Sequence, residues 1–172
     1  MTALPDAELW RIAAKIRLLI LDVDGVMTDG RLHYDPEGRE FKTFHVRDGY
    51  GLKRLMAAGI EVAVISGRMS GSTTGRMTEL GVRHVMLGRE DKSAALNELV
   101  ARLGIGTDLA ACVGDDAPDL EMMNRVALPI AVADCHASIL SAAAWRTSLP
   151  GGAGAVREVC DLLLAARAQP RG

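Results

Sequence analysis

Short unbroken runs of aliphatic residues recur along the chain, separated by longer stretches in which apolar residues return every three or four positions. The first run, Leu18-Leu-Ile-Leu21, does not alternate with polar residues. Such a run is typical of a strand that is covered on both faces, as in a parallel sheet. Similar runs predict further strands at 61–66, 83–88, 109–114, 128–132 and 145–147.

Helical periodicity occupies the stretches between these runs. One helix turns Leu52, Leu55 and Met56 inward and ends at Gly59. The other predicted helices cover residues 5–13, 70–80, 91–103 and 119–125, a short segment from 136, and 154–167. Strands that alternate with helices in this way predict an α/β fold with a doubly wound, Rossmann-like parallel sheet, built by a single domain over residues 1–172.

A different pattern follows the first strand. Residues 31–45 contain two alternating polar and apolar stretches around Asp35-Pro36-Glu37-Gly38, a sequence that favours a type I turn. We therefore expect a β-hairpin, which could act as a flap over the loop that follows the first strand. The next segment, Val46–Gly51, breaks the alternation and is expected to lead into the following helix.

Composition narrows the classes of function. Only 3% of the 172 residues are aromatic, so the core must be aliphatic. The net charge of −2 gives no basic surface for nucleic acid, and no apolar stretch approaches membrane-spanning length. The first residues lack a signal-peptide pattern, and three widely spaced cysteines favour free thiols in a reducing compartment. We expect a cytoplasmic protein.

Polar residues follow the carboxyl ends of the predicted strands. They are Asp22 and Asp24 after the first strand, Ser66-Gly67-Arg68 after the second, Lys92 in the helix after the third, and Asp115, Asp116 and Asp119 after the fourth. A parallel sheet brings these ends to one edge. Two carboxylates two residues apart predict a Mg²⁺ site or a coupled acid pair there, although an Asx turn would also explain D-x-D-G.

These residue types suit phosphoryl transfer. Asp22 could attack phosphorus and carry the phosphoryl group as an aspartyl-phosphate. Asp24 could protonate the leaving oxygen and later take a proton from water. Oxygen ligands from Asp22, Asp115 and a backbone carbonyl near Asp24 suit Mg²⁺, while Ser66 and Lys92 could hold the phosphoryl oxygens.

The ordered set of motifs resembles the haloacid dehalogenase superfamily of phosphatases. That superfamily has D-x-D-G at the first strand, Ser/Thr-Gly-Arg at the second, a Lys before the fourth and G-D-D-x-x-D at the fourth. The resemblance implies a nucleophile (Asp22), an acid/base (Asp24), phosphate-binding residues (Ser66, Gly67, Lys92), Mg²⁺ ligands (Asp22, Asp115 and the carbonyl of Asp24) and supporting acids (Asp116, Asp119).

Nearly the whole chain also resembles one capless family of that superfamily, the 3-deoxy-D-manno-octulosonate 8-phosphate phosphatases of lipopolysaccharide sugar synthesis. The likeness lies in residues 22–30, 46–52, 65–68, 113–116, 131–134 and 154–164. Members are homotetramers whose β-hairpins associate, and a neighbouring subunit helps cover each active site. The resemblance implies substrate contacts from Asp24, His45, Val46, Arg47, Asp48, Gly49, Lys53, Arg68, Arg76 and Lys92, whose cations suit a sugar acid phosphate.

Alternatives stay open. His45 and Ala153 stand where the family often has Asn and Arg, so a nine-carbon sugar acid 9-phosphate is a second candidate substrate. A phospho-aspartyl receiver domain is also doubly wound, but its phosphoacceptor follows the third strand, which here ends in Met86-Leu87-Gly88. A non-catalytic assembly module is the third alternative. Without the resemblance, Arg47, Lys53 and Arg76 fit surface cations equally well. Asp116 and Asp119 also fit helix caps or acids in a first helical turn.

Overall fold

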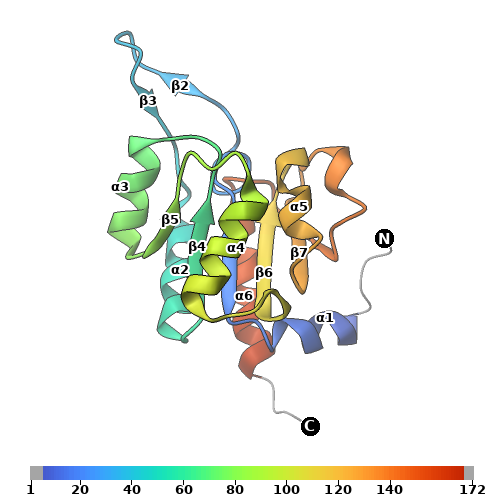
Figure 1. The fold of residues 1–172 in the computed structure, drawn as a ribbon. Coiled ribbons are helices and arrows are strands. Elements are labelled where there is room, and N and C mark those ends of the chain that lie inside the picture. Colours follow the sequence, from blue (N-terminus) through green and yellow to red (C-terminus); the bar gives the residue numbers. More distant parts are fainter. Residues whose placement is uncertain (1–5, 169–172) are drawn as a thin grey trace.

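Six parallel strands form one sheet in the order β5-β4-β1-β6-β7-β8 in the computed structural model, which describes residues 6–168 (Figure 1). The strands are β1 (Leu18–Leu21), β4 (Glu61–Ile65), β5 (His84–Met86), β6 (Ala110–Gly114), β7 (Leu128–Ala131) and β8 (Trp145–Arg146). The order runs outward in both directions from the neighbours β1 and β6. Ligands of such sheets bind beyond the carboxyl ends at this switch point. The predicted doubly wound α/β fold is confirmed.

Helices cover both faces of the sheet (Figure 1). One face carries α1 (Asp6–Ala13), α2 (Val46–Ala57), α3 (Gly71–Leu80) and α6 (Ala155–Ala168), and the other carries α4 (Lys92–Leu103) and α5 (Leu120–Met123). Alternate residues of β1 serve the two layers: Leu19 and Leu21 pack on the first, Leu18 and Ile20 on the second. All four are fully buried, which explains the unbroken aliphatic run.

Local signals fix several of the predicted boundaries. The Ser70 hydroxyl accepts a hydrogen bond from the Thr73 N–H at the start of α3, and the Asp91 carboxylate does the same for Ala94 at the start of α4. Gly81 and Gly104 end these helices with φ of 80° and 62°, a left-handed conformation that suits glycine. Both helices therefore occupy the expected segments.

The predicted hairpin projects from the body of the protein (Figure 1). Its strands are short: β2 (His33–Tyr34) pairs antiparallel with β3 (Glu40–Phe41). The Asp35 carboxylate closes the turn by accepting from the N–H groups of Glu37 and Arg39, at 3.0 and 2.8 Å. The alternation over 31–45 thus gives a hairpin with two-residue strands.

Helix α2 begins earlier than predicted, because the segment Val46–Gly51 is already helical. His45 caps the helix by accepting from the Arg47 N–H. Its glycines are set by close packing: a Cβ at Gly49 would lie 2.3 Å from the Arg76 guanidinium, and one at Gly51 would lie 3.1 Å from Cys160 Cβ. These glycines interrupt the hydrophobic pattern at positions where a Cβ would press on side chains of the neighbouring helices.

Smaller differences concern the ends of the chain and two short turns. The predicted helix over 119–125 is a 3₁₀ turn, η2 (Ala117–Asp119), followed by α5, and the segment from 136 forms the 3₁₀ turn η3 (Ala137–Ile139). The predicted start of the first helix at residue 5 lies outside the described residues. No helix in the described part combines the length and apolarity needed to span a membrane.

Candidate active site

A cavity of about 340 Å³ opens beyond the carboxyl ends of β1, β4 and β6. It is lined by Asp22, Asp24, Ser66, Gly67, Arg68, Glu90, Lys92, Asp115, Asp116, Pro118 and Asp119. Each predicted catalytic, phosphate-binding, metal-binding and supporting residue therefore lies on one cavity wall. The chain brings them together from positions almost one hundred residues apart because parallel strands end at the same edge.

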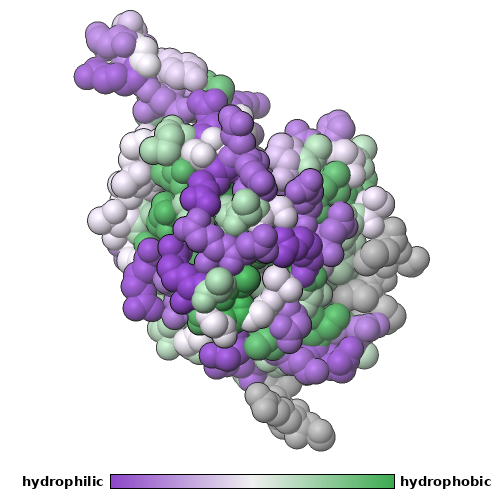
Figure 2. Space-filling view, in the orientation of Figure 1, coloured by the Kyte–Doolittle hydropathy of each residue, from purple (hydrophilic) through white to green (hydrophobic). Residues whose placement is uncertain are grey.

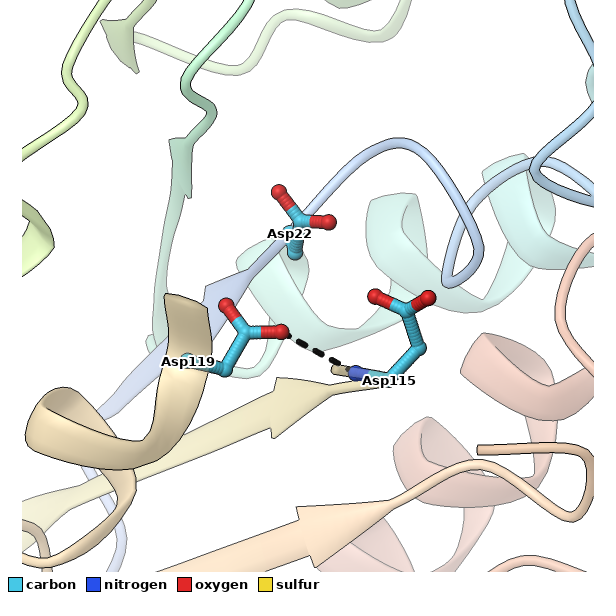
Figure 3. A group of neighbouring side chains, drawn as sticks. All are labelled: Asp22, Asp115 and Asp119. Carbon is cyan, nitrogen blue, oxygen red and sulfur yellow. Dashed lines mark hydrogen bonds between the residues drawn. The ribbon is translucent and has the colours of Figure 1, made fainter. Parts of the chain in front are cut away.

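Lys92 forms the centre of the charge arrangement. This first residue of α4 has a side chain only 5% exposed, and its Nζ lies 2.8 Å from Asp22 Oδ1 and 2.6 Å from Asp119 Oδ1. The second oxygen of Asp119 accepts from the Asp115 N–H at 3.0 Å (Figure 3). Asp119 thus uses both oxygens to hold Lys92 and the loop after β6, which fits its predicted supporting role.

Three carboxylates converge in this cavity. Oxygens of Asp22, Asp115 and Asp119 lie within 4.8 Å of one another, and Figure 3 shows them approaching from the end of β1, the end of β6 and the following helical turn. A Cβ at Gly25 would lie 2.1 Å from Asp115 Oδ2, so only glycine lets the loop after β1 pass this carboxylate. Hard oxygen donors gathered in this way fit Mg²⁺.

The pKa values of these acids show how crowded the charges are. Burial, with help from Asp119, raises the pKa of Asp22 to about 6 although Lys92 opposes the rise. Burial and the neighbouring Asp22 and Asp119 raise the pKa of Asp115 to about 7. Burial alone would lower the pKa of Lys92, but the two carboxylates beside it outweigh burial and raise it. One lysine does not balance three acids, and a divalent cation would.

This imbalance predicts a pH-dependent stability in metal-free protein. Because the folded pKa of Asp115 and Asp22 lies above the unfolded value of about 3.9, their contribution to stability is present below pH 4 and is lost as the pH rises through 6 to 7. Mg²⁺ at about 100 times its Kd should restore about 2.7 kcal/mol at pH 8, measured by urea unfolding.

The matched variant is Asp115→Asn. At pH 8 without metal, we expect the free energy of unfolding of this variant to exceed that of the natural chain by on the order of 1 kcal/mol. The gain is small because the partial exposure of Asp115 screens the charges. The variant should also lose the stabilisation by Mg²⁺. A metal-free Asp115→Asn protein that is clearly less stable at pH 8 would contradict the repulsion assigned to this cluster.

Ser66, Gly67 and Asp116 occupy the predicted loops. Ser66 is 3% exposed and follows β4, where its hydroxyl accepts from the Arg68 N–H at 3.3 Å. Asp116 accepts from the Ala117 N–H at 2.7 Å and so caps the following turn. A capping role for Asp116, an alternative to direct support of the metal site, is therefore present in the structure.

Two charged residues of the hairpin reach the same site and were missed by sequence reasoning. Lys42 Nζ contacts Asp24 Oδ1, and Glu40 Oε2 accepts from Arg68 Nη2 at 2.5 Å. The Lys42 side chain is 2% exposed and that of Glu40 is 15% exposed. The alternation of the hairpin predicts that residues 40 and 42 share one face. The sequence alone does not predict which residues that face contacts.

Most of the remaining predicted substrate contacts lie away from this cavity. His45 caps α2, and the buried Asp48 carboxylate accepts from the Arg157 N–H at 2.8 Å, at the start of α6. Burial raises the pKa of Asp48. Val46 is 78% exposed. The start of α2 therefore faces α6 and solvent within one chain.

The cations of α2 and α3 that were predicted to contact substrate lie in three different places outside this cavity. Arg76 pairs with Glu79 at 2.8 Å and lies against Gly49. Arg47 lines a separate pocket beside α6, and Lys53 lines another pocket near Glu61. Glu61 begins β4, so that pocket lies at the amino end of the strand. Of the predicted substrate contacts, one chain brings only Asp24, Arg68 and Lys92 to the cavity beyond β1, β4 and β6.

Comparison with known families gives a consistent result. The model of the haloacid dehalogenase-like hydrolase family matches residues 81–151. The 3-deoxy-D-manno-octulosonate 8-phosphate phosphatase of Yersinia pestis is 46% identical over 160 residues, which cover 93% of this chain and 86% of that protein. The similarity therefore extends over the hairpin and every strand of the sheet.

Solved structures agree in fold along almost the full length. The 3-deoxy-D-manno-octulosonate 8-phosphate phosphatase of Moraxella catarrhalis, in complex with magnesium, phosphate and KDO, is 40% identical with a TM-score of 0.92, and the match covers 95% of this chain and 94% of that one. The cobalt-bound enzyme of Haemophilus influenzae is 42% identical, with a TM-score of 0.87, and covers 90% and 91% of the two chains.

Proposed function

The chain belongs to the 3-deoxy-D-manno-octulosonate 8-phosphate phosphatases of the haloacid dehalogenase-like hydrolases, and from this membership we propose its reaction and the residues that perform it. It is a Mg²⁺-dependent phosphoric monoester hydrolase that converts 3-deoxy-D-manno-octulosonate 8-phosphate to the free sugar acid and phosphate. The observation that carries this proposal is the convergence of Asp22, Lys92 and Asp115 in one cavity of a chain 46% identical to such an enzyme.

Asp22 is the proposed nucleophile. One carboxylate oxygen attacks phosphorus, the bond from phosphorus to the sugar O8 breaks, and an aspartyl-phosphate forms. Asp24 gives a proton to the departing O8. In the second half, Asp24 takes a proton from water, whose oxygen attacks phosphorus and releases phosphate and the free Asp22 carboxylate. Lys92 and Ser66 hold the phosphoryl oxygens throughout.

The metal ligands proposed are the carboxylates of Asp22 and Asp115 and the backbone carbonyl of Asp24. When bound, Mg²⁺ would neutralise phosphate charge and let the anionic Asp22 approach. Asp119 also lies in the carboxylate cluster, but both of its oxygens are engaged by Lys92 and the Asp115 N–H. We therefore assign Asp119 to supporting these residues.

A homotetramer completes the proposal. The hairpin exposes Leu32, Tyr34 and Phe41 by 47%, 55% and 51%, and it stands out from the body where a second copy could pack on it (Figure 2). Apolar side chains exposed together on one projecting element favour an association surface. Neighbouring subunits could then supply Arg47, Lys53 and Arg76, which one chain leaves outside the cavity. Light scattering should give four times the 18.3 kDa chain mass.

The setting proposed for this enzyme is the cytoplasm. Cys112 and Cys160 are buried free thiols, and Cys135 is a half-buried one. Burial raises the pKa of all three, so they are protonated and unreactive at neutral pH. Thiols of this kind agree with a reducing compartment.

Phosphate release tests the proposed substrate. Purified chain is incubated with 3-deoxy-D-manno-octulosonate 8-phosphate, a nine-carbon sugar acid 9-phosphate and an eight-carbon sugar phosphate that lacks the carboxylate, each with Mg²⁺ or with EDTA. We expect kcat/KM to be highest for the first ester and release to stop with EDTA. Higher kcat/KM for the nine-carbon ester would overturn the substrate, and no release from any ester would overturn the phosphatase activity.

A further inference from the structure

The hairpin carries a lysine that is almost completely buried against the loop after β1. The Lys42 side chain is 2% exposed, and its Nζ contacts Asp24 Oδ1 and lies 3.5 Å from Glu40 Oε1. Lysines are almost never so buried without paired acids, because removing the ammonium group from water is costly. The hairpin therefore places a fixed positive charge on the residue that the proposed reaction uses as its acid and base.

The two oxygens of Asp24 have different surroundings. Oδ1 is held by Lys42, whereas Oδ2 has no hydrogen-bond partner among the described residues. Arg68 Nε lies 3.7 Å from Oδ2, beyond hydrogen-bond distance. The Asp24 carboxyl group is thus tied at Oδ1, while the buried Oδ2 is left without a hydrogen bond from the described residues.

Glu40 pairs with Arg68, the second cation beside this carboxylate. Its Oε2 accepts from Arg68 Nη2 at 2.5 Å, and the Tyr34 hydroxyl lies 3.4 Å from the same nitrogen. Near the base of the hairpin, one cation thus contacts Asp24 Oδ1 and another forms an ion pair with Oδ2 at 3.7 Å. Lys42 and Arg68 both lie outside the loop after β1, which carries Asp24.

On the premise of the proposed phosphatase reaction, we propose that Lys42 is a positioning residue that holds the Asp24 carboxyl group at the cavity, within reach of the leaving oxygen. A proton donor must lie within hydrogen-bond reach of the atom that it protonates. Asp24 lies in a loop, and its side chain could otherwise rotate away from the cavity. Loss of Lys42 should therefore impair proton donation, and it should leave phosphoryl binding by Ser66 and Lys92 intact.

Leaving-group chemistry separates this role from a merely structural one. Phenyl phosphate has a leaving group as basic as a tyrosine side chain, with a pKa of about 10, and gains from protonation. The leaving group of 4-nitrophenyl phosphate is far more acidic and departs without it. A misplaced acid therefore slows the first ester and spares the second, whereas a distorted fold or a lost phosphate site slows both.

The experiment compares kcat/KM of Lys42→Met with that of the natural chain on both aryl esters with Mg²⁺. We expect a loss of about 100-fold on phenyl phosphate and of roughly threefold or less on 4-nitrophenyl phosphate. Lys42→Arg, which keeps the charge on Asp24, should recover at least about tenfold on phenyl phosphate. Lys15→Met, at an exposed lysine before β1, is the matched control and should behave as the natural chain.

Equal losses on the two esters, or no loss on either, would overturn the proposal. If Lys42→Met fails to fold, judged by its unfolding midpoint, Lys42→Gln is measured against the same ratio, since it keeps a hydrogen-bond donor and removes the charge. Aryl esters also separate this proposal from the choice of sugar. A natural chain that cleaves the aryl esters but not the octulosonate ester would overturn the substrate, while the ratio would still decide the role of Lys42.

Discussion

Replacement of Asp22 by Asn should lower kcat by at least about 10⁴-fold while the chain stays folded. The amide has the shape of the carboxylate but no anionic oxygen that can attack phosphorus. Lys92 keeps its second partner, Asp119 Oδ1 at 2.6 Å, so the arrangement beneath the cavity survives the change. The loss should therefore come from chemistry and not from a collapsed site.

Two measurements check this result. Steady-state phosphate release gives kcat, and rapid quenching in acid, followed by mass spectrometry, detects phosphate bound to the chain. The natural chain should show a phosphorylated species during turnover, and Asp22→Asn should show none. Asp108→Asn, at an exposed acid before β6, is the control and should keep both signals. Undiminished phosphate release by Asp22→Asn would refute the proposed nucleophile.

The convergence of residues at the candidate site could be predicted from sequence because they follow strands with strong signals. Leu18–Leu21 is aliphatic throughout since both faces of β1 are covered, and Asp22 comes directly after it. Parallel topology then decides which distant residues become neighbours. Asp22 and Lys92 are seventy positions apart in the chain. Asp22 Oδ1 and Lys92 Nζ nevertheless lie 2.8 Å apart, because both residues follow strands that end at one edge of the sheet.

The start of α2 and the role of Lys42 could not be predicted from the same patterns. Gly49 and Gly51 look like helix breakers, whereas in the structure they lie within α2, close to Arg76 and Cys160. Lys42 looks like an ordinary polar position of a hairpin, and its burial follows from where the hairpin folds back onto Asp24. In each case the contact joins two elements that are distant in the sequence, and the periodicity of either element does not predict that they will meet.

A third group of predicted contacts is not brought to the candidate site by a single chain. The resemblance assigns substrate contacts to Arg47, Lys53 and Arg76, but these side chains line other surfaces of the single chain. A resemblance in sequence assigns a role to a residue, but it does not say in which subunit's site the residue would act. Exposed apolar residues on the hairpin provide the physical reason to expect a neighbouring copy there.

Replacement of Lys92 by Met should lower kcat by about 10³-fold, because the phosphoryl group loses a preorganised positive charge in a buried site. The same change should also reduce the free energy of unfolding of metal-free protein by about 3 kcal/mol at pH 8, since Asp22 and Asp119 keep their buried charges without a cation. Within the described residues, Lys92 is the only cation that pairs with Asp22 or Asp119.

The pH dependence identifies the cause of this instability. Lys92 lowers the pKa of Asp22, so its removal should raise that pKa further above the unfolded value. Protonation then relieves the repulsion at low pH, and the deficit of Lys92→Met should shrink as the pH falls from 8 to 5. Urea unfolding at the two pH values measures this, with Lys15→Met as the exposed-lysine control.

Mg²⁺ separates the two roles of Lys92. The cation should return part of the lost stability to Lys92→Met, because it binds the same carboxylates. It should not return kcat, since the ammonium group proposed to hold the phosphoryl oxygens is still missing. Recovery of kcat along with stability would show that Lys92 acts only by balancing Asp22 and Asp119. A deficit that is equal at pH 5 and pH 8 would instead point to lost packing of the lysine side chain.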